Sequence, residues 1–358
     1  MEHLASTTGL LGRSIELLGS TARLLPRSAG LLETSAELLA STSGVLALTG
    51  EVAVFCGGAG APGRPSAALT GPGCFPPSAF QGQIASLPQQ GRTMSSTILL
   101  DVADGVATLT LNRPAALNAL SFEMMGALSE ATARLAHRDD LRVVVIKGAG
   151  EHFMAGGDLK DFAGQLHLSP ESRIASFRAT IEQDINRSVE ALAGLRVPVI
   201  GRVHGACAGF GLSLALGCDM VLAADTAYFT TAYGSIALSG DGGVSWFLPR
   251  IVGRHKAFEL LLMAERFDAA EALRLGVANK VVPAAELDAA VDALVGRILR
   301  GPKEAYAEMK RLLNQSPDQS LDAQLQLEAE AFARCAARPD FDEGIGAFLD
   351  KRKPKFNG

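Results

Sequence analysis

The stretch VPVIGRVHGACAGFGLSLALGCDMVLAAD, residues 197–225, decides the fold of this chain. It holds an apolar strand pattern at 199–203, a turn of small residues at 208–211, an apolar helical pattern at 210–216 and another strand pattern at 220–223. Short apolar runs that alternate with helical segments are typical of α/β proteins. The stretch therefore predicts a strand–helix–strand unit with a glycine turn at its centre.

The same alternation continues toward the N-terminus. Residues 98–102 and 106–111 alternate in polarity around Asp104-Gly105, which predicts a β-hairpin. A helical pattern follows at 122–136, then a buried strand at 143–146 and a second helical stretch at about 170–195. These segments extend the α/β pattern up to the central stretch.

Toward the C-terminus the pattern becomes helical. A strand is predicted at 228–230, and most of the chain after about Gly242 has helical periodicity. We therefore expect an α/β core domain over residues 94–300 and a C-terminal helical region over 301–358.

The first 93 residues have a different pattern. Leu-Leu pairs recur every seven residues from 10–11 to 38–39, and a segment rich in Gly, Pro, Ser and Ala follows at 57–91. A coiled coil needs two separated apolar positions per heptad, whereas these leucines are adjacent and Pro26 interrupts them. Three explanations stay open: translated upstream DNA with the true start at Met94, which we favour, a weakly ordered extension, or a functional docking or targeting segment.

Composition excludes several classes of protein. The 33 Lys+Arg and 38 Asp+Glu give a net charge of −5, which argues against a nucleic-acid binder. The five cysteines are scattered without a C-x-x-C, so we expect reduced thiols in the cytoplasm and no metal site. No apolar run reaches the roughly 18 residues of a membrane span.

Three glycine-containing turns are the first candidates for chemistry. They are Ala155-Gly156-Gly157-Asp158-Leu159, Ala208-Gly209-Phe210-Gly211 and Gly240-Asp241-Gly242-Gly243. Small residues let a ligand approach the backbone, and two backbone N–H groups that converge on one carbonyl oxygen form an oxyanion hole. Spacing alone leaves the alternative open that these are tight turns between packed elements.

The order of the motifs is more specific than any one of them. LTLNRPAALNAL (109–120), HFMAGGDLKDF (152–162), the central stretch (197–225), FLPRIVG (247–253) and EGIGAFLDKRKPKF (343–356) follow one another in the chain. This series resembles the enoyl-CoA hydratase/isomerase, or crotonase, family. The resemblance covers residues 94–358 and none of 1–93.

The resemblance implies a spiral of ββα units and an acyl-CoA substrate. Coenzyme A would be part of that substrate, and no separate cofactor is expected. It also implies a homotrimer or a dimer of trimers. In such proteins two backbone N–H groups hold the thioester oxygen, and the matching positions here are Gly157 and Phe210. Position 210 is usually glycine in the family, so we expect the phenylalanine to narrow or reshape the acyl pocket.

The resemblance also suggests contacts for the rest of coenzyme A. Ala155, Asp158 and Leu159 match the segment that holds the adenine end, and Lys160 is a candidate for a phosphate. Asp158 also has a structural interpretation, as a residue that ties the turn. The family often has a further lysine where this chain has Ala115, so that contact is missing.

The positions of the two hydratase carboxylates match Ser213 and Tyr233. A hydratase uses such a pair for general acid and base chemistry on a water molecule. Serine is not a base near neutral pH, and tyrosine has a pKa of about 10. Hydration through the usual pair is therefore disfavoured, and we expect Ser213 and Tyr233 to contribute to substrate binding or to the pocket wall.

Asp241 is the remaining acid in the right neighbourhood. Residues 227–250 resemble the isomerase branch that acts on ring-epoxidised phenylacetyl-CoA, although that branch has Pro-Asp where this chain has Gly240-Asp241. A structural alternative is an N-cap, because Asp is favoured just before a helix. A capping bond would stabilise the charged form and make Asp241 a weaker base.

The preferred interpretation is an acyl-CoA isomerase in which Asp241 is the single base and Gly157 and Phe210 form the oxyanion hole. Phe162, Phe229 and Trp246 are candidates for the acyl pocket or for the core. Two alternatives stay open: an enoyl-CoA hydratase-type lyase, and a protein that binds CoA thioesters without turnover.

Overall fold

The computed structural model describes residues 96–356. The predicted repeat region at 1–93, with its three explanations, lies outside the described residues. The predicted boundary at residue 300 falls where one helix ends at Leu299 and the next begins at Lys303. Whether that boundary separates two domains stays a prediction.

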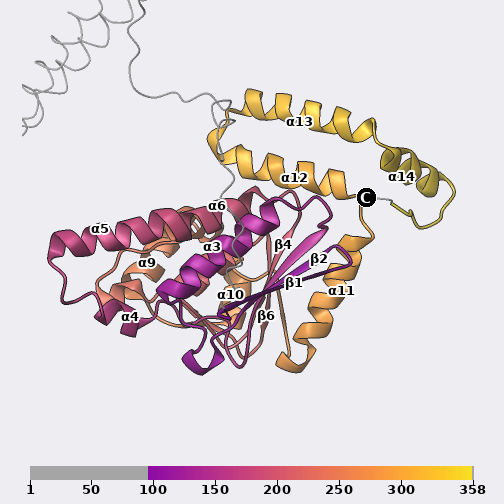
Figure 1. The fold of residues 1–358 in the computed structure, drawn as a ribbon. Helices are drawn as coiled ribbons and strands as arrows, with labels where there is room; N and C mark the ends of the chain where they lie inside the picture. The colour runs from indigo at the N-terminus through magenta and orange to yellow at the C-terminus, as the bar shows by residue number, and fades with distance from the viewer. Residues whose placement is uncertain (1–95, 357–358) are drawn as a thin grey trace, which may run out of the picture. The chain divides into compact units, whose positions relative to one another are not determined.

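Six strands form the main sheet, in the order β1-β2-β3-β4-β6-β9 (Figure 1). They are β1 Ile98–Ala103, β2 Val106–Leu111, β3 Val143–Gly148, β4 Val199–Val203, β6 Met220–Ala224 and β9 Lys280–Val282. β1 and β2 pair antiparallel, and every later pair in the sheet is parallel. Asp104 and Gly105 both have positive φ angles, of 51° and 78°, as a tight hairpin turn requires. The predicted hairpin is confirmed.

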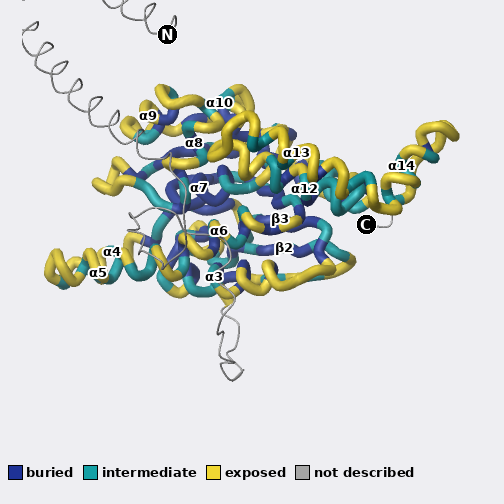
Figure 2. The backbone as a smooth tube through the Cα atoms, turned by 90° about the horizontal axis from the view of Figure 1, so that it is seen from above, coloured by how far each residue is buried: buried dark blue, intermediate teal, exposed yellow. Residues whose placement is uncertain are grey.

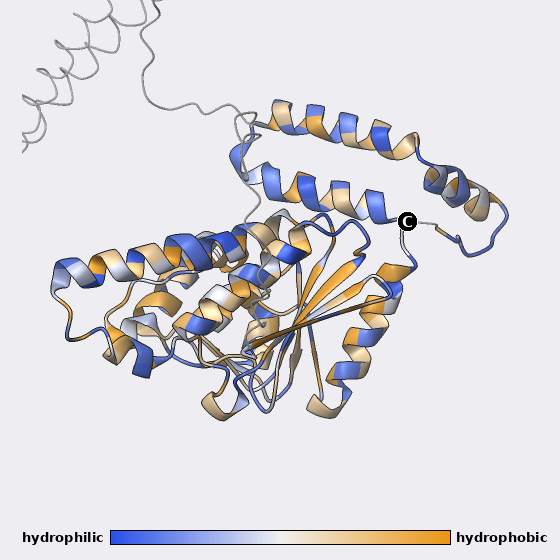
Figure 3. Cartoon of the chain, in the orientation of Figure 1, coloured by the Kyte–Doolittle hydropathy of each residue, from blue (hydrophilic) through white to orange (hydrophobic). Residues whose placement is uncertain are grey.

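Helices cover both faces of this sheet. Three of these helices are α3 Phe122–Ala136, α6 Asn186–Gly194 and α11 Leu287–Leu299. Val144 and Ile146 of β3 belong to the cluster that includes α3 and α6, whereas Val143 and Val145 pack with α11. A strand buried on both faces has a run of apolar residues, as β3 does at 143–146. Figure 2 shows β2 and β3 among the buried elements, and Figure 3 shows the strands as the most hydrophobic part of the fold.

A second sheet of three short strands brings two glycine turns together. It consists of β5 Ala206–Ala208, β7 Tyr228–Thr230 and β8 Phe267–Asp268. An isolated parallel bridge joins Met154 to Cys207, so the turn after Met154 lies beside the turn after β5. The predicted helix at 210–216 is confirmed as α7 Phe210–Leu216, and all seven of its residues are buried.

Two features depart from the predicted elements. The stretch at 170–195 is not one regular helix but α5 Pro170–Thr180, a π-helical turn η3 Ile181–Ile185, and α6. The region after Gly242 is mostly helical, as expected, with α8 Val244–Val252, α9 Arg254–Met263 and α10 Ala269–Leu275. It also contains β8 and β9, which have two and three residues and are too short to show a periodicity.

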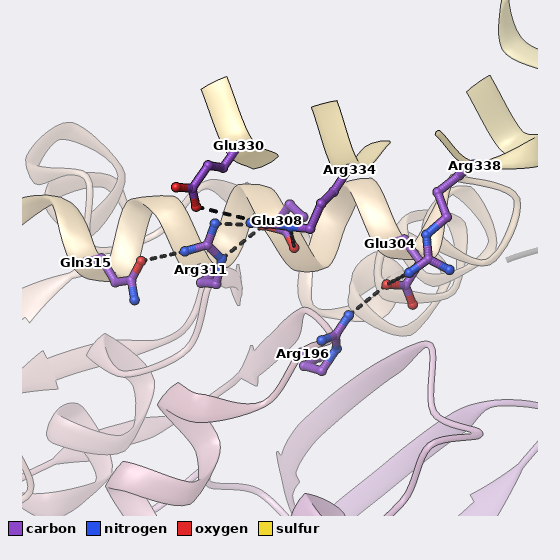
Figure 4. A network of polar contacts seen from close by, with 8 residues as sticks. All are labelled: Arg196, Glu304, Glu308, Arg311, Gln315, Glu330, Arg334 and Arg338. Atoms are coloured by element: carbon purple, nitrogen blue, oxygen red, sulfur yellow. Dashed lines mark hydrogen bonds and ion pairs between the residues drawn. The ribbon is translucent and has the colours of Figure 1, made fainter. Parts of the chain in front are cut away.

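The C-terminal helical region is confirmed as α12 Lys303–Gln315, α13 Leu321–Ala336 and α14 Pro339–Leu349. Figure 4 shows an ion pair between α12 and α13, in which Glu308 contacts Arg334, and a pair within α12, in which Glu308 contacts Arg311. Glu304 pairs with Arg338 and also with Arg196, which follows α6. Each exposed pair contributes little alone, but together they fix α13 on α12 and tie α12 to the core.

Within residues 96–356, no helix is long and apolar enough to cross a membrane. The same residues contain no group of three His, Cys, Asp or Glu side chains placed to hold a metal ion.

Candidate active site

Two glycine turns form one wall of a cavity of about 250 Å³. Gly156 and Gly209 have φ angles of 101° and 52°, which favour glycine. A Cβ on Gly209 would stand 3.1 Å from the Cα of Gly156, so the two backbones touch where a side chain would separate them. The close approach brings the amides of Gly157 and Phe210 to the same cavity.

Both of these amides lack a hydrogen-bond acceptor within the described part of the chain. Their neighbours are occupied: the N–H of Asp158 donates to Leu120 O at 3.0 Å, and the N–H of Gly209 donates to Thr230 O at 3.1 Å. The turns are thus fixed by adjacent hydrogen bonds while two donors stay available. Two free donors that line one cavity suit a ligand oxygen that carries negative charge.

Asp241 also lines the cavity and lies in a turn that contains three glycines. Gly240, Gly242 and Gly243 have φ angles of 112°, 59° and 81°. A Cβ on Gly242 would stand 2.7 Å from the ring of Phe210, whose residue is 1% exposed. The Phe210 ring is therefore packed beneath the Asp241 turn. Phe210 also lines the cavity, and the expectation that its side chain narrows or reshapes the acyl pocket stays a prediction.

Two hydroxyl groups hold Asp241. The hydroxyl of Tyr233 donates to Asp241 Oδ1 at 2.6 Å. Ser213 Oγ lies 2.9 Å from the Tyr233 hydroxyl and donates to the backbone O of Asp241 at 2.9 Å. The predicted capping role of Asp241 is wrong, because the N-cap of α8 is Gly243 and no side chain caps that helix.

Burial sets the protonation of this group. It raises the pKa of Asp241, and the hydrogen bond from Tyr233 opposes that rise in part. Burial and the neighbouring charge of Asp241 raise the pKa of Tyr233, so the phenol stays protonated and acts as a donor. The cavity thus holds one carboxylate with increased basicity beside a neutral hydroxyl.

The remaining predicted residues divide into two groups. Ala155 and Leu159 line the cavity, and Leu159 is 57% exposed at its mouth. Asp158, Lys160 and Ser213 do not line it. Asp158 accepts from the N–H of Lys160 at 3.0 Å and pairs with Arg113 at 2.8 Å, which confirms its structural interpretation. The Lys160 side chain is exposed.

A second cavity of about 380 Å³ adjoins the first and also reaches Asp241. Met125, Phe162 and Leu238 line both cavities. The second, which we call the aromatic chamber, is walled by Phe122, Phe162 and Phe177. The Phe162 and Phe177 rings meet edge to face with centroids 5.3 Å apart.

Sequence reasoning found Phe162 but missed Phe122, Phe177 and Leu238, because they come from separate segments without a shared motif. Phe229, another candidate, stacks on Phe267 in the core, and Trp246 is exposed on α8 beneath Arg250. Neither lines the two cavities.

A larger cavity of about 710 Å³ lies between α8, α11 and α12. None of the predicted site residues lines it. We therefore assign the cavity beside the glycine turns as the candidate active site, because it holds Asp241 and the two free amides, although it is smaller.

Comparison with known proteins agrees with this geometry. Residues 101–358 match the family model described as Enoyl-CoA hydratase/isomerase. The chain is 37% identical over 266 residues to 1,2-epoxyphenylacetyl-CoA isomerase of Escherichia coli (strain K12), covering 74% of this chain and 100% of that protein. It is 36% identical over 263 residues to a probable enoyl-CoA hydratase of Rhodobacter capsulatus, covering 73% and 98%.

The fold has the same relatives. The crystal structure of a putative enoyl-CoA hydratase/isomerase from Mycobacterium abscessus superposes with a TM-score of 0.69 and 34% identity. The match covers 73% of this chain and 99% of that one. The predicted crotonase-like α/β fold with a C-terminal helical region is confirmed.

Proposed function

The chain belongs to the enoyl-CoA hydratase/isomerase family, and within that family we propose that it is an acyl-CoA isomerase. It moves a double bond, or opens a ring, in a CoA thioester with one base. The observation that carries the proposal is the position of Asp241. Among the described residues that line the two cavities it is the one carboxylate, and the free amides of Gly157 and Phe210 share its cavity.

The mechanism follows from this arrangement. Asp241 removes a proton from the acyl chain, and the negative charge spreads onto the thioester oxygen. The amides of Gly157 and Phe210 stabilise that charge, an interaction in which one donor is typically worth about 2.7–4 kcal/mol. Asp241 then returns the same proton to another carbon. Burial supports both steps, because a base with a raised pKa is better matched to neutral pH.

The contact between Ser213 and Tyr233 argues against hydration. Their oxygens are 2.9 Å apart, a direct hydrogen bond. Two groups that hold one water between them lie about 4.5–5.5 Å apart. Neither group is a carboxylate, and Ser213 does not line the cavity. A hydratase is the second candidate, because one relative of similar identity carries that name.

We propose that the acyl group carries an aromatic or other ring. The aromatic chamber next to Asp241 supports this, as does the relative named for 1,2-epoxyphenylacetyl-CoA. The CoA portion of the substrate would extend past Ala155 and Leu159, with exposed Lys160 near a phosphate. Asp158 would hold that turn through Arg113 rather than contact the ligand.

Assembly and location remain proposals. We propose a homotrimer, or a dimer of trimers, in the cytoplasm. Exposed apolar side chains support an assembly: Leu313, Phe332 and Phe348 are 72%, 74% and 81% exposed. Apolar side chains grouped on the C-terminal helices favour burial against a neighbouring subunit. Light scattering at several protein concentrations tests the trimer.

Asp241→Asn tests the function. We expect the full-length variant to lose isomerisation of a 3-enoyl-CoA by about a thousandfold or more while it still binds the CoA thioester. Asn keeps the shape of the side chain and removes its basicity. Equal turnover in both proteins would contradict Asp241 as the base. No turnover in either protein, with binding retained, would favour the alternative of a binding protein.

A further inference from the structure

Tyr233 and Ser213 form a chain of hydroxyl groups behind Asp241. Tyr233 begins the 3₁₀ turn η4 Tyr233–Ile236 and is 7% exposed, and Ser213 on α7 is fully buried. The chain is continuous: Asp241 Oδ1 is 2.6 Å from the Tyr233 hydroxyl, which is 2.9 Å from Ser213 Oγ. It closes on the backbone of the same residue, because Ser213 Oγ lies 2.9 Å from Asp241 O.

The hydrogen-bond donors and acceptors of this closed chain match in both protonation states of Asp241. When Asp241 is a carboxylate, Tyr233 donates to Oδ1 and Ser213 donates to the backbone O. When Asp241 has taken up a proton on Oδ2, the oxygen to which neither hydroxyl donates, Tyr233 still donates to Oδ1 and Ser213 still donates to the backbone O. Every hydroxyl proton has an acceptor in both states. Neither hydroxyl has to rotate when the proton is transferred.

We propose that Tyr233, backed by Ser213, is a positioning residue that holds Asp241 in one orientation throughout the proton shuttle by donating its hydrogen bond to Oδ1 in both protonation states, which leaves Oδ2 to exchange the proton with the substrate. The inference rests on the proposed function, since it assumes that Asp241 alternates between the charged and neutral forms. No proton leaves the group: the one taken from the substrate stays on Asp241 until it is returned.

The surroundings of Tyr233 suit this role. The loop before it is tied to α9, because Thr230 Oγ1 donates to Ala264 O and Thr231 Oγ1 to Leu260 O, both at 2.8 Å. Besides Asp241, the described residues that line the two cavities include two titratable side chains, Tyr233 and Arg173 of α5. A substitution at Tyr233 should therefore show its effect in the titration of Asp241.

Three variants of the full-length chain separate positioning from packing. Tyr233→Phe keeps the ring and removes the donor. We expect kcat for a 3-enoyl-CoA to fall about tenfold with KM within twofold, because a misplaced base slows the chemical step. The acid limb of kcat/KM should also move to higher pH by about one pH unit, since a hydrogen bond to a charged oxygen is lost.

Ser213→Ala keeps the bond from Tyr233 to the carboxylate. It should lower kcat a few-fold without moving the acid limb. Tyr228→Phe makes the same chemical change at a tyrosine outside both cavities and should change neither quantity. An acid limb in Tyr233→Phe that coincides with that of the unmodified protein would overturn the proposal, as would an equal shift in Tyr228→Phe.

Infrared titration distinguishes failure of this inference from failure of the proposed function. The difference spectrum between the unmodified protein and Asp241→Asn isolates one carboxyl group and needs no turnover. A protein without isomerase activity would contradict the proposed function. Even without activity, a titration of Asp241 that moves to higher pH in Tyr233→Phe would support the hydrogen bond between Tyr233 and Asp241. A titration of Asp241 that does not move would overturn the inference.

Discussion

The ring of Phe162 lies directly against Gly157, such that a Cβ built on Gly157 would stand 2.6 Å from Phe162 Cζ. Gly157 provides one of the two free amides, and Phe162 lines both the site cavity and the aromatic chamber. Because position 157 has no side chain, the Phe162 ring can lie against it and form the partition between the two cavities. This contact therefore links the proposed oxyanion hole to the proposed acyl pocket.

Gly157→Ala tests that link. The new methyl group would displace either the Phe162 ring or the turn that carries the amide, and a shift of about 1 Å in a positioning group can cost about a hundredfold. We expect kcat/KM for a 3-enoyl-CoA to fall about tenfold to a hundredfold. The double variant Gly157→Ala, Phe162→Ala removes the collision and should recover part of the loss.

Gly126→Ala is the matched control. A Cβ on Gly126 in α3 would meet nothing within 4 Å, so the substitution should keep activity and stabilise the helix by about 0.5–1 kcal/mol. If Gly157→Ala were as active as Gly126→Ala, the contact with Phe162 would have no influence on the site.

Phe162→Ala should change the preference among acyl groups. Removing the ring joins two cavities of about 250 and 380 Å³ that already share Met125, Leu238 and Asp241. We expect kcat/KM for bulky, ring-bearing acyl-CoA substrates to rise relative to that for short ones by about tenfold. Competition between two such substrates in one reaction measures the ratio. An unchanged ratio would show that the partition does not select the acyl group.

The raised pKa of Asp241 predicts opposite effects of pH on activity and stability. The base works as a carboxylate, so activity rises as the pH increases through this raised pKa, and the acid limb lies above the range of an ordinary aspartate. The folded state holds the proton more tightly than the unfolded state, so the contribution of Asp241 to stability falls over the same pH range. Asp241→Asn should therefore be the more stable protein, with a margin that grows as pH increases. Urea unfolding at several pH values checks this, and a margin that shrinks with pH would contradict it.

Lys310 should contribute to the stability of the core. Its ammonium group is buried and lies 2.7 Å from Asp219 Oδ2, and it also donates to Leu192 O and Val197 O. Lys310→Met leaves the Asp219 charge without this partner, and we expect it to lower the free energy of unfolding by about 3 kcal/mol. Arg178→Ala, which breaks an exposed pair with Glu182, should have a much smaller effect on the free energy of unfolding. Equal losses in the two variants would contradict a special role for Lys310.

Hydrophobic periodicity predicted the helices and strands in which the burial of the residues follows a regular pattern along the chain. The helices at 122–136 and 210–216 begin and end where expected, because the first buries residues at helical spacing along one face and the second buries all seven of its residues. β8 and β9 were missed because pairing between distant segments creates them. The π-helical turn within 170–195 was missed because it changes the hydrogen bonding without interrupting the helical pattern.

Family motifs found the residues around the cavity, but the sequence did not indicate how they interact. Tyr233 and Asp241 are eight positions apart, and Ala237 and Gly240 between them have positive φ angles, as does Ala232 just before Tyr233. No local pattern predicts that such a loop folds a tyrosine back onto the aspartate. For the same reason, the substitution of carboxylates by Ser213 and Tyr233 indicated only a loss of hydratase chemistry, whereas the structure shows a partner for Asp241.

The most direct test of the central claim is to incubate the full-length protein separately with a 3-enoyl-CoA and with crotonyl-CoA, and to follow both by absorbance and mass. We predict that the double bond of the 3-enoyl-CoA shifts with no change in mass, and that crotonyl-CoA gains no water. A product heavier by one water molecule would contradict the isomerase proposal and would mean that groups other than Ser213 and Tyr233 activate water in this cavity.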